Sequence, residues 1–323
     1  MTAHVPKDGC VSNTGQLRRR WPLSGWRTTS EDVTKQRPFR WLIYDNNGSY
    51  NGYFDWLPLW MRVGYWSPVT VLFMTAFYVS MITRKPGRLE FAMAIQAEES
   101  GRTVWWTCVD TLVFVWGVVV LVHAKRTMDN VGALFMSYTG WSWTLLTARA
   151  GCEAAASLLS SVDLPGVAGF LAVVGSALRF PAAVAAVITF TVWNFVLLPL
   201  IGLVATPREK RKHFLKFNFG FLMTNVHMIN LPLALVGNVW GPTARLFTTS
   251  DLWIGYLIVM LYSILYLFVM DRLGLHFYPV FCPRSAFCGM SFGLVLYLYY
   301  DLLHRGNAVM LMMNPHLAPV ASE

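Results

Sequence analysis

The chain has 323 residues, of which 55% are hydrophobic and 13% charged. Soluble domains carry about 25% charged residues, and a chain of this length has no interior large enough to bury so much apolar surface. The formal net charge of +9 does not indicate a nucleic-acid binder, because the basic residues lie in the N-terminal part and in short stretches between apolar runs, where Lys and Arg face lipid headgroups. The composition therefore predicts an all-α integral membrane protein that crosses the bilayer several times and binds no nucleic acid.

Residues 1–62 are predicted to form a polar, basic tail with loose structure, because their apolar content is low. The tail ends in an aromatic stretch that is typical of a membrane interface. The five cysteines are scattered and odd in number. This pattern predicts neither a disulfide framework nor a metal site.

Apolar stretches follow from residue 63 to residue 304, and each is long enough to cross about 30 Å of hydrocarbon at about 1.5 Å per residue. The predicted spans lie near 63–83, 104–124, 132–160, 180–204, 214–238, 251–271 and 287–304. The first is short and carries Pro68 near its start. The sequence therefore predicts a transmembrane helix bundle of six or seven spans over 63–304, followed by a short C-terminal tail at 305–323.

Two groups of basic residues bear on the orientation of this bundle. Lys125 and Arg126 follow the second predicted span, and the basic stretch Arg208–Lys216 follows the fourth. With seven spans, the excess of Lys and Arg in cytosolic loops places both groups and the tail on the cytosolic side. A six-span bundle moves the tail across the membrane. We favour seven spans and leave six open.

Ionisable side chains at membrane depth are rare and often functional. Arg149 and Glu153 are four residues apart on one predicted helix, so we expect them to pair with each other. His227 lies midway along the fifth predicted span, and Thr224 and Asn230 are each three residues from it on about the same helix face. A neutral imidazole with a hydrogen-bond partner is a usable general base. A packing histidine that bonds to a neighbouring helix is an equally good interpretation.

A general base needs a group to activate, and the third predicted span offers several hydroxyls near its start. They are Ser137, Tyr138, Thr139, Ser142, Thr144 and Thr147. Hydroxyls are common in membrane helices because they bond back to their own helix or across to another. Periodicity does not single out one of the six.

Four short stretches resemble the androgen-induced/FAR-17a-like family of membrane proteins and, more distantly, the rolling-stone proteins. They are Phe135–Thr139, Leu178–Ala182, Asn225–Pro232 and Gly274–Pro279. Their order and spacing suit the family over residues 104–304.

The resemblance implies a threonine hydrolase that cleaves fatty acid esters of hydroxy fatty acids within the membrane. It implies Thr139 as the nucleophile and His227 as the base, with Asn225 or Asn230 orienting the ring or donating to the oxyanion. The expected partners are a lipid ester substrate and membrane lipids of an endomembrane or the plasma membrane, and no metal or cofactor is required. A transporter or channel with His227 in a polar pathway, and a structural membrane protein without chemistry, are the alternatives. The sequence gives no oligomeric state.

Overall fold

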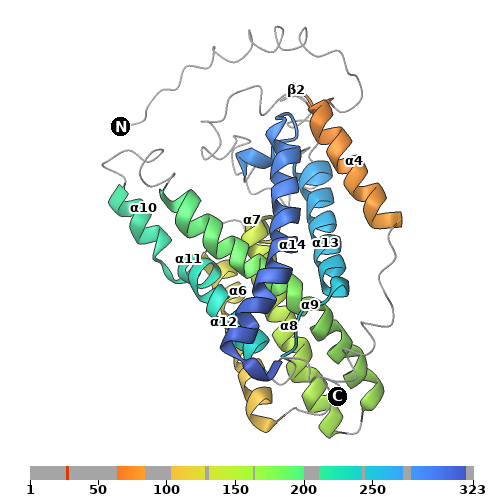
Figure 1. Ribbon diagram of the computed structural model, residues 1–323. Helices are drawn as coiled ribbons and strands as arrows, with labels where there is room; N and C mark the ends of the chain where they lie inside the picture. The colour runs from red at the N-terminus through yellow and green to blue at the C-terminus, as the bar shows by residue number, and fades with distance from the viewer. Residues whose placement is uncertain are drawn as a thin grey trace. The chain divides into compact units, whose positions relative to one another are not determined.

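The computed structural model describes residues 27–28, 64–83, 103–127, 131–162, 164–199, 211–241, 244–271 and 278–317. Most of these residues are helical (Figure 1). The exception to the helical pattern is a short antiparallel ladder between β1 (Arg27–Thr28) and β2 (Gly64–Tyr65). Nearly all of the predicted tail at 1–62 lies outside the described residues, so its prediction stays untested.

The helices follow one another along the chain, and four of them (α9, α11, α12 and α13) continue directly from or into segments of the wider π-helical form. The order is α4 (Pro68–Thr83), α6 (Val104–Thr127), α7 (Val131–Met136), α8 (Tyr138–Ser161), α9 (Pro165–Thr191), the π-helix η1 (Val192–Leu197), α10 (Arg211–Asn218), α11 (Phe221–Thr224), the π-helix η4 (Asn225–Ile229), α12 (Asn230–Val239), α13 (Thr249–Ile264), the π-helix η5 (Leu265–Met270) and α14 (Phe287–Met313). Two short 3-10 helices, η6 (Pro279–Phe281) and η7 (Pro315–Leu317), lie before and after α14 in the chain.

Among the residues that the structure describes, three helical stretches are long and apolar enough to cross a membrane. They are Val104–Thr127, Pro165–Leu197 and Thr249–Met270. The helix α4 is apolar but shorter. On α6, large apolar side chains such as Trp105 and Leu112 are more than two-thirds exposed, which suits a helix that faces lipid. The fold is therefore all-α with three candidate membrane spans, as an integral multi-pass membrane protein requires.

Several of the predicted spans have different ends in the structure. The fourth begins at Pro165 rather than at 180, because this proline occupies the first helical turn, where its missing N–H costs nothing. The third is broken at Ser137, whose hydroxyl accepts a hydrogen bond from the Gly140 amide and caps α8. The fifth is divided into α10, α11, η4 and α12, and the seventh continues to Met313.

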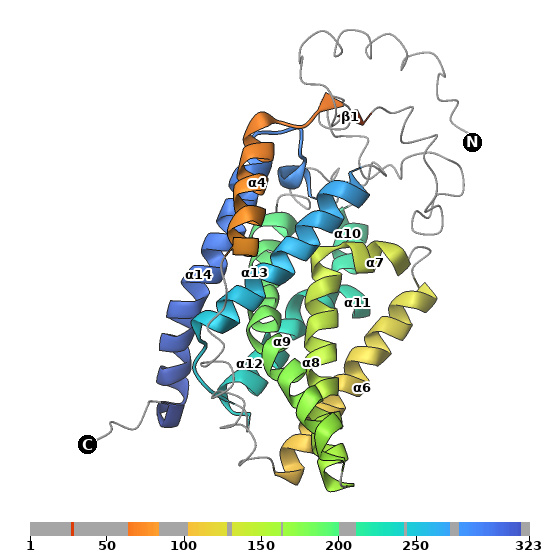
Figure 2. The ribbon, with the colours of Figure 1, turned by 90° about the vertical axis from the view of Figure 1, so that its right-hand side faces the viewer.

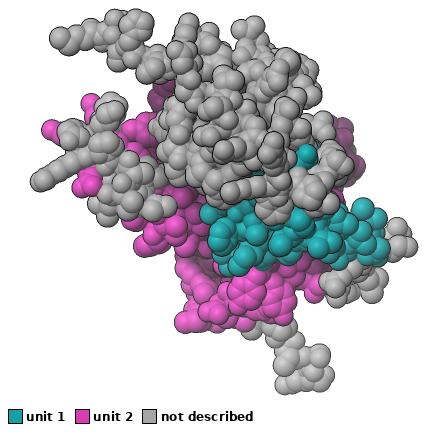
Figure 3. Space-filling view, turned by 90° about the horizontal axis from the view of Figure 1, so that it is seen from above, with its two compact units in different colours: residues 1–83, 263–295 teal, residues 84–262, 296–323 magenta. Residues whose placement is uncertain are grey.

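The chain divides into two compact units, which are coloured separately in Figure 3. Unit 1 comprises residues 1–83 and 263–295, and unit 2 comprises residues 84–262 and 296–323. In unit 1, Arg284 forms a buried ion pair with Asp271, which also accepts a hydrogen bond of 3.0 Å from the Trp66 indole. The Thr70 hydroxyl donates to the Ser285 carbonyl oxygen at 3.1 Å, so α4 is fixed to the segment before α14.

Unit 2 has α8 as its central helix, with α6 and α9 packed alongside it (Figure 2). Glycines allow α6 and α9 to approach α8 closely. A Cβ on Gly117 of α6 would overlap the Thr147 side chain, and a Cβ on Gly175 of α9 would lie 2.8 Å from Glu153 Oε1. Packing through small residues is the usual way in which helices associate in lipid.

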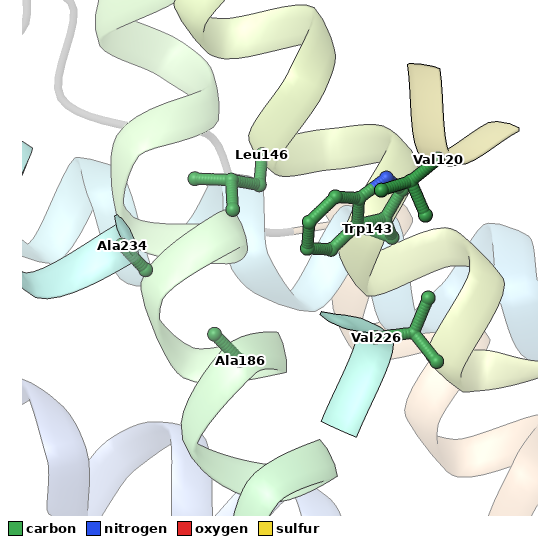
Figure 4. Close-up of a cluster of buried hydrophobic side chains, with 6 residues drawn as sticks. All are labelled: Val120, Trp143, Leu146, Ala186, Val226 and Ala234. Atoms are coloured by element: carbon green, nitrogen blue, oxygen red, sulfur yellow. The ribbon is translucent and has the colours of Figure 1, made fainter. Parts of the chain in front are cut away.

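The core of unit 2 joins several helical elements around Trp143 (Figure 4). Its buried members are Val120, Trp143, Leu146, Ala186, Val226 and Ala234. They come from α6, α8, α9, η4 and α12, so this cluster fixes the segment that carries His227 against the centre of the unit.

Candidate functional site

The four residues singled out from the sequence all lie in unit 2. His227 and Asn225 belong to η4 and are each 4% exposed, and Asn230 opens α12 and is fully buried. Thr139 lies in the first turn of α8 and is partly buried. The expected nucleophile and the expected base therefore lie on different helical elements of one unit.

Two hydrogen bonds define how α8 lies beside α12. Asn230 Nδ2 donates to Ser142 Oγ at 2.7 Å, and Arg149 Nη2 donates to the Gly237 carbonyl oxygen at 3.2 Å. Both bonds join residues 88 positions apart. The two helices therefore run in the same direction with one register. The same separation of 88 joins Thr139 to His227.

A second observation relates Thr139 to the segment that carries His227. Thr139 lies four residues before Trp143, hence on nearly the same side of the helix. Trp143 packs in the core cluster with Val226, the residue before His227 (Figure 4). Thr139 is therefore one turn from a residue that packs beside the histidine's own segment.

The imidazole of His227 stacks on an aromatic ring that the sequence did not single out. The Trp193 ring lies parallel to it, with centroids 4.0 Å apart and an interplanar angle of 10°. The next residue, Asn194, donates from Nδ2 to the His227 carbonyl oxygen at 3.2 Å. Trp193 and Asn194 belong to η1 and His227 to η4, so two π-helical segments meet at the histidine. Such segments are often found at functional sites.

Several buried polar atoms on η4 and on the helical elements that contact it have no hydrogen-bond partner within the described part of the chain. They are His227 Nδ1, Asn194 Oδ1, Asn230 Oδ1 and Thr189 Oγ1. Buried polar atoms are normally satisfied, and a base whose ring nitrogen is not engaged by a donor can take up a proton.

The two asparagines expected to assist the histidine have other hydrogen bonds. Asn225 Oδ1 accepts from the Trp116 indole of α6 at 2.8 Å, and its Nδ2 donates to the Phe221 carbonyl oxygen. Asn230 Nδ2 donates a hydrogen bond to Ser142 Oγ, as described above. The asparagine that contacts His227 is Asn194, through the backbone. Its position as a polar residue within an apolar span was the one signal that pointed to it.

The described residues contain no group of three His, Cys, Asp or Glu side chains that could hold a metal ion. The hydrogen bond that the structure gives Arg149 runs to Gly237 on α12, and the Glu153 carboxylate lies against Gly175 of α9. The two side chains are thus directed to different neighbours, and the expected pairing along α8 is replaced by contacts between helices.

Comparisons with protein-family models, with curated proteins and with solved structures gave no match. The family resemblance therefore stays a prediction from the four sequence stretches. Of these, most of Gly274–Pro279 lies outside the described residues.

Proposed function

We propose that the protein is an intramembrane lipid ester hydrolase in which Thr139 is the nucleophile and His227 the general base. The observation that carries this proposal is the packing of α8 against the η4–α12 segment, because the Asn230–Ser142 hydrogen bond and the core contact of Trp143 with Val226 put α8 beside the segment that carries His227. The proposal includes a bundle of seven spans, in which the three long apolar stretches are joined by α4, α8, the α10–α12 segment and α14.

The chemistry is a two-step acyl transfer. Thr139 Oγ1 forms a bond to the acyl carbon while the imidazole accepts the hydroxyl proton. The bond from the acyl carbon to the alcohol oxygen then breaks, and the imidazolium returns the proton to the leaving alcohol. His227 then takes a proton from water, whose oxygen attacks the acyl-threonine carbon; the bond to Thr139 Oγ1 breaks, the imidazolium returns the proton to that oxygen, and the carboxylic acid is released. No metal or cofactor enters either step.

The stacked Trp193 ring supports a charged intermediate in both steps. The face of an indole is electronegative and attracts a cation placed over it. The imidazolium forms on this face, with its ring parallel to the indole. Asn194 holds the backbone carbonyl of the same residue, and the stacking on Trp193 supports one orientation of the histidine ring when the proton moves.

The test is hydrolysis of a fatty acid ester of a hydroxy fatty acid by purified wild type, Thr139→Ala, Thr139→Ser and His227→Ala. We expect about a 100-fold or larger loss in both alanine variants, because positioned acid–base catalysis contributes at least this much, and retained turnover in Thr139→Ser. Labelling by a fluorophosphonate probe should follow the same order.

Two matched controls distinguish the site from general damage. Thr144→Ala removes a neighbouring hydroxyl of α8, and His123→Ala removes a histidine that packs on Phe221. Both should keep near-normal turnover. If Thr139→Ala or His227→Ala hydrolyses the ester as well as these controls do, the mechanism is wrong. A well-folded wild type that neither hydrolyses nor labels would favour transport or a structural role.

A further inference from the structure

Within the described part of the chain, four exposed basic side chains of unit 2 have no hydrogen-bond or ion-pair partner. Lys125 and Arg126 lie in the last turn of α6, and Lys212 and Lys216 lie on α10. A single exposed lysine is ordinary at a protein surface. The four are informative because the fold brings them to one edge of the unit.

The helix α11 joins the two pairs of basic residues. It begins two residues after the end of α10 and packs on α6. The ring of Phe221 in α11 lies 4.7 Å from the ring of His123, measured between centroids. Lys125 and Arg126 follow His123 by two and three residues. Basic groups that are far apart in the sequence therefore border the same surface.

The helix α10 exposes its lysines on one side and is anchored on another. Lys212 and Lys216 are four residues apart and lie on one face. Asn218, the last residue of the helix, is 2% exposed and lies about 200° around the helix from Lys216. Its Oδ1 accepts a hydrogen bond of 2.7 Å from the Trp193 indole. The lysines are thus on the side of α10 that faces away from Trp193.

Large apolar side chains are exposed beside these lysines, which distinguishes the surface from a solvated loop. Leu215, Phe217, Phe219 and Phe221 are between 40% and 57% exposed. A helix at a bilayer interface combines Lys or Arg with exposed Phe and Leu in this way. The last turn of α6 also ends a candidate membrane span, so the surface lies where a bilayer presents its headgroups.

The charge of the surface distinguishes among headgroups. The adjoining sequence adds two bases, Arg208 and Lys210, and two acids, Glu209 and Asp129. These flanking charges cancel, which leaves the four unpartnered cations. A zwitterionic headgroup supplies no net charge to them. An anionic headgroup does, with a gain of about fivefold in affinity for each Lys or Arg close to it.

We propose that α10 and the end of α6 form a binding surface for anionic phospholipids. The basic side chains bind the headgroup, and the exposed phenylalanines contact the acyl chains. Basic loops that only set the orientation of a membrane protein need no such preference among lipids. Nothing in the proposed acyl transfer uses these residues, so the surface is additional to the site around His227.

A connection from α10 to His227 gives the surface a further consequence, which rests on the proposed function. Asn218 accepts the hydrogen bond of the Trp193 indole, and the Trp193 ring stacks on the His227 imidazole with centroids 4.0 Å apart. A lipid that holds α10 in place therefore also holds the ring on which the imidazolium forms. Ester hydrolysis then increases with anionic phospholipid, and Asn218 is the positioning residue.

The first test is equilibrium binding of lipid to the full chain in micelles of a nonionic detergent. The probes are phosphatidylserine and phosphatidylcholine with the same fluorescent acyl chain, followed by fluorescence anisotropy. Phosphatidylserine should bind about 10-fold more tightly, between the contribution of one cation and that of two. Lys212→Gln with Lys216→Gln should reduce the preference to about twofold. Lys212→Arg with Lys216→Arg should keep it, as should Arg305→Gln, which changes an exposed arginine of α14.

Three results of this test would overturn the inference. They are equal binding of the two lipids, an unchanged preference in the double glutamine variant, and displacement of phosphatidylserine by glycerophosphoserine. The last compound has the headgroup without acyl chains, so its binding would assign the surface to a soluble anion.

The second test is ester hydrolysis in phosphatidylcholine nanodiscs with and without phosphatidylserine. Turnover by the wild type should rise about fivefold with phosphatidylserine, the low end of coupling between two sites. Asn218→Leu should lose this rise and keep the lipid preference. Trp193→Phe, which keeps an aromatic ring but removes the indole donor, should do the same.

The outcomes separate the surface from the proposed function. A rise that persists in both variants, or an active wild type without a rise, would refute the connection to His227. No hydrolysis in either lipid, with the preference for phosphatidylserine intact, would refute the proposed function and support the surface alone.

Discussion

The hydrogen bond between Asn230 and Ser142 fixes the register on which the proposed site depends, and it can be tested by a double-mutant cycle. The changes are Ser142→Ala, Asn230→Ala and the two together. Both side chains are fully buried, and Nδ2 lies 2.7 Å from Oγ. If the register is correct, the effects of the two substitutions on the free energy of unfolding are not additive.

The expected magnitude follows from this geometry. Ser142→Ala leaves the buried Asn230 amide without its acceptor, which costs about 1–3 kcal/mol of the free energy of unfolding. Asn230→Ala also removes packing volume. Side-chain hydrogen bonds between membrane helices have coupling energies of about 0.6 kcal/mol on average and up to about 1.7 kcal/mol. Because this pair is short and excluded from solvent, we expect a coupling of about 1–1.5 kcal/mol.

The assay is reversible unfolding of the four proteins in mixed micelles at increasing fractions of denaturing detergent. A second cycle pairs Asn230→Ala with Ser157→Ala. Ser157 bonds to Thr107 of α6 at 2.6 Å and lies about 22 Å along the helix from Ser142. This control should be additive to within about 0.5 kcal/mol. A coupling below about 0.3 kcal/mol for Ser142 and Asn230 would refute the register.

Three further changes test other parts of the fold. Gly140→Ala should eliminate most folded protein on size-exclusion chromatography, because its Cβ would overlap the Leu134 carbonyl oxygen. Arg284→Met should cost about 3–5 kcal/mol in thermal unfolding, since it removes the guanidinium that forms a buried ion pair with the Asp271 carboxylate. Burial raises the pKa of the Cys282 thiol, so its thiolate is scarce at neutral pH and N-ethylmaleimide should modify it slowly in the native state, faster as pH rises.

Each of these has a matched comparison. Gly166→Ala should be tolerated, because no atom lies within 4 Å of the added methyl, and equal damage from both glycine variants would contradict the steric argument. The double variant Asp271→Asn with Arg284→Met should recover part of the lost stability. A Cys282 that reacts with N-ethylmaleimide as fast in the native as in the unfolded protein would not be buried.

The fold class and the position of two of the three long apolar helices were predictable because apolar length is a local property of the sequence. The predicted span at 251–271 corresponds to Thr249–Met270, and both the predicted second span and α6 begin at residue 104. The predicted start of the fourth span at 180 excluded Arg179 from the membrane helix. The structure buries this arginine completely and supplies Asn238 as an acceptor 59 residues away. Such a partner has no local signature.

The surroundings of the candidate site could not be predicted for the same reason. The sequence pointed to His227, but its stacking partner Trp193 lies in another helical segment, far from it along the chain. That contact depends on two π-helical segments, and a π-helix adds a residue to one turn without a characteristic residue type. Asn225 shows the converse. Its place close to His227 in sequence suggested that it assists the histidine, yet its side-chain oxygen accepts from the Trp116 indole of α6.

The common direction of α8 and α12 has a consequence for how the protein is made. At about 5–20 residues per second of synthesis, the 88 residues that separate each bonded pair take roughly 4–18 s to add. During this interval Ser142 and Arg149 are already synthesised, and the helix that will accept them is not. Ribosome-bound chains of increasing length would thus pass through a period in which a polar stripe of α8 depends on the insertion machinery for protection.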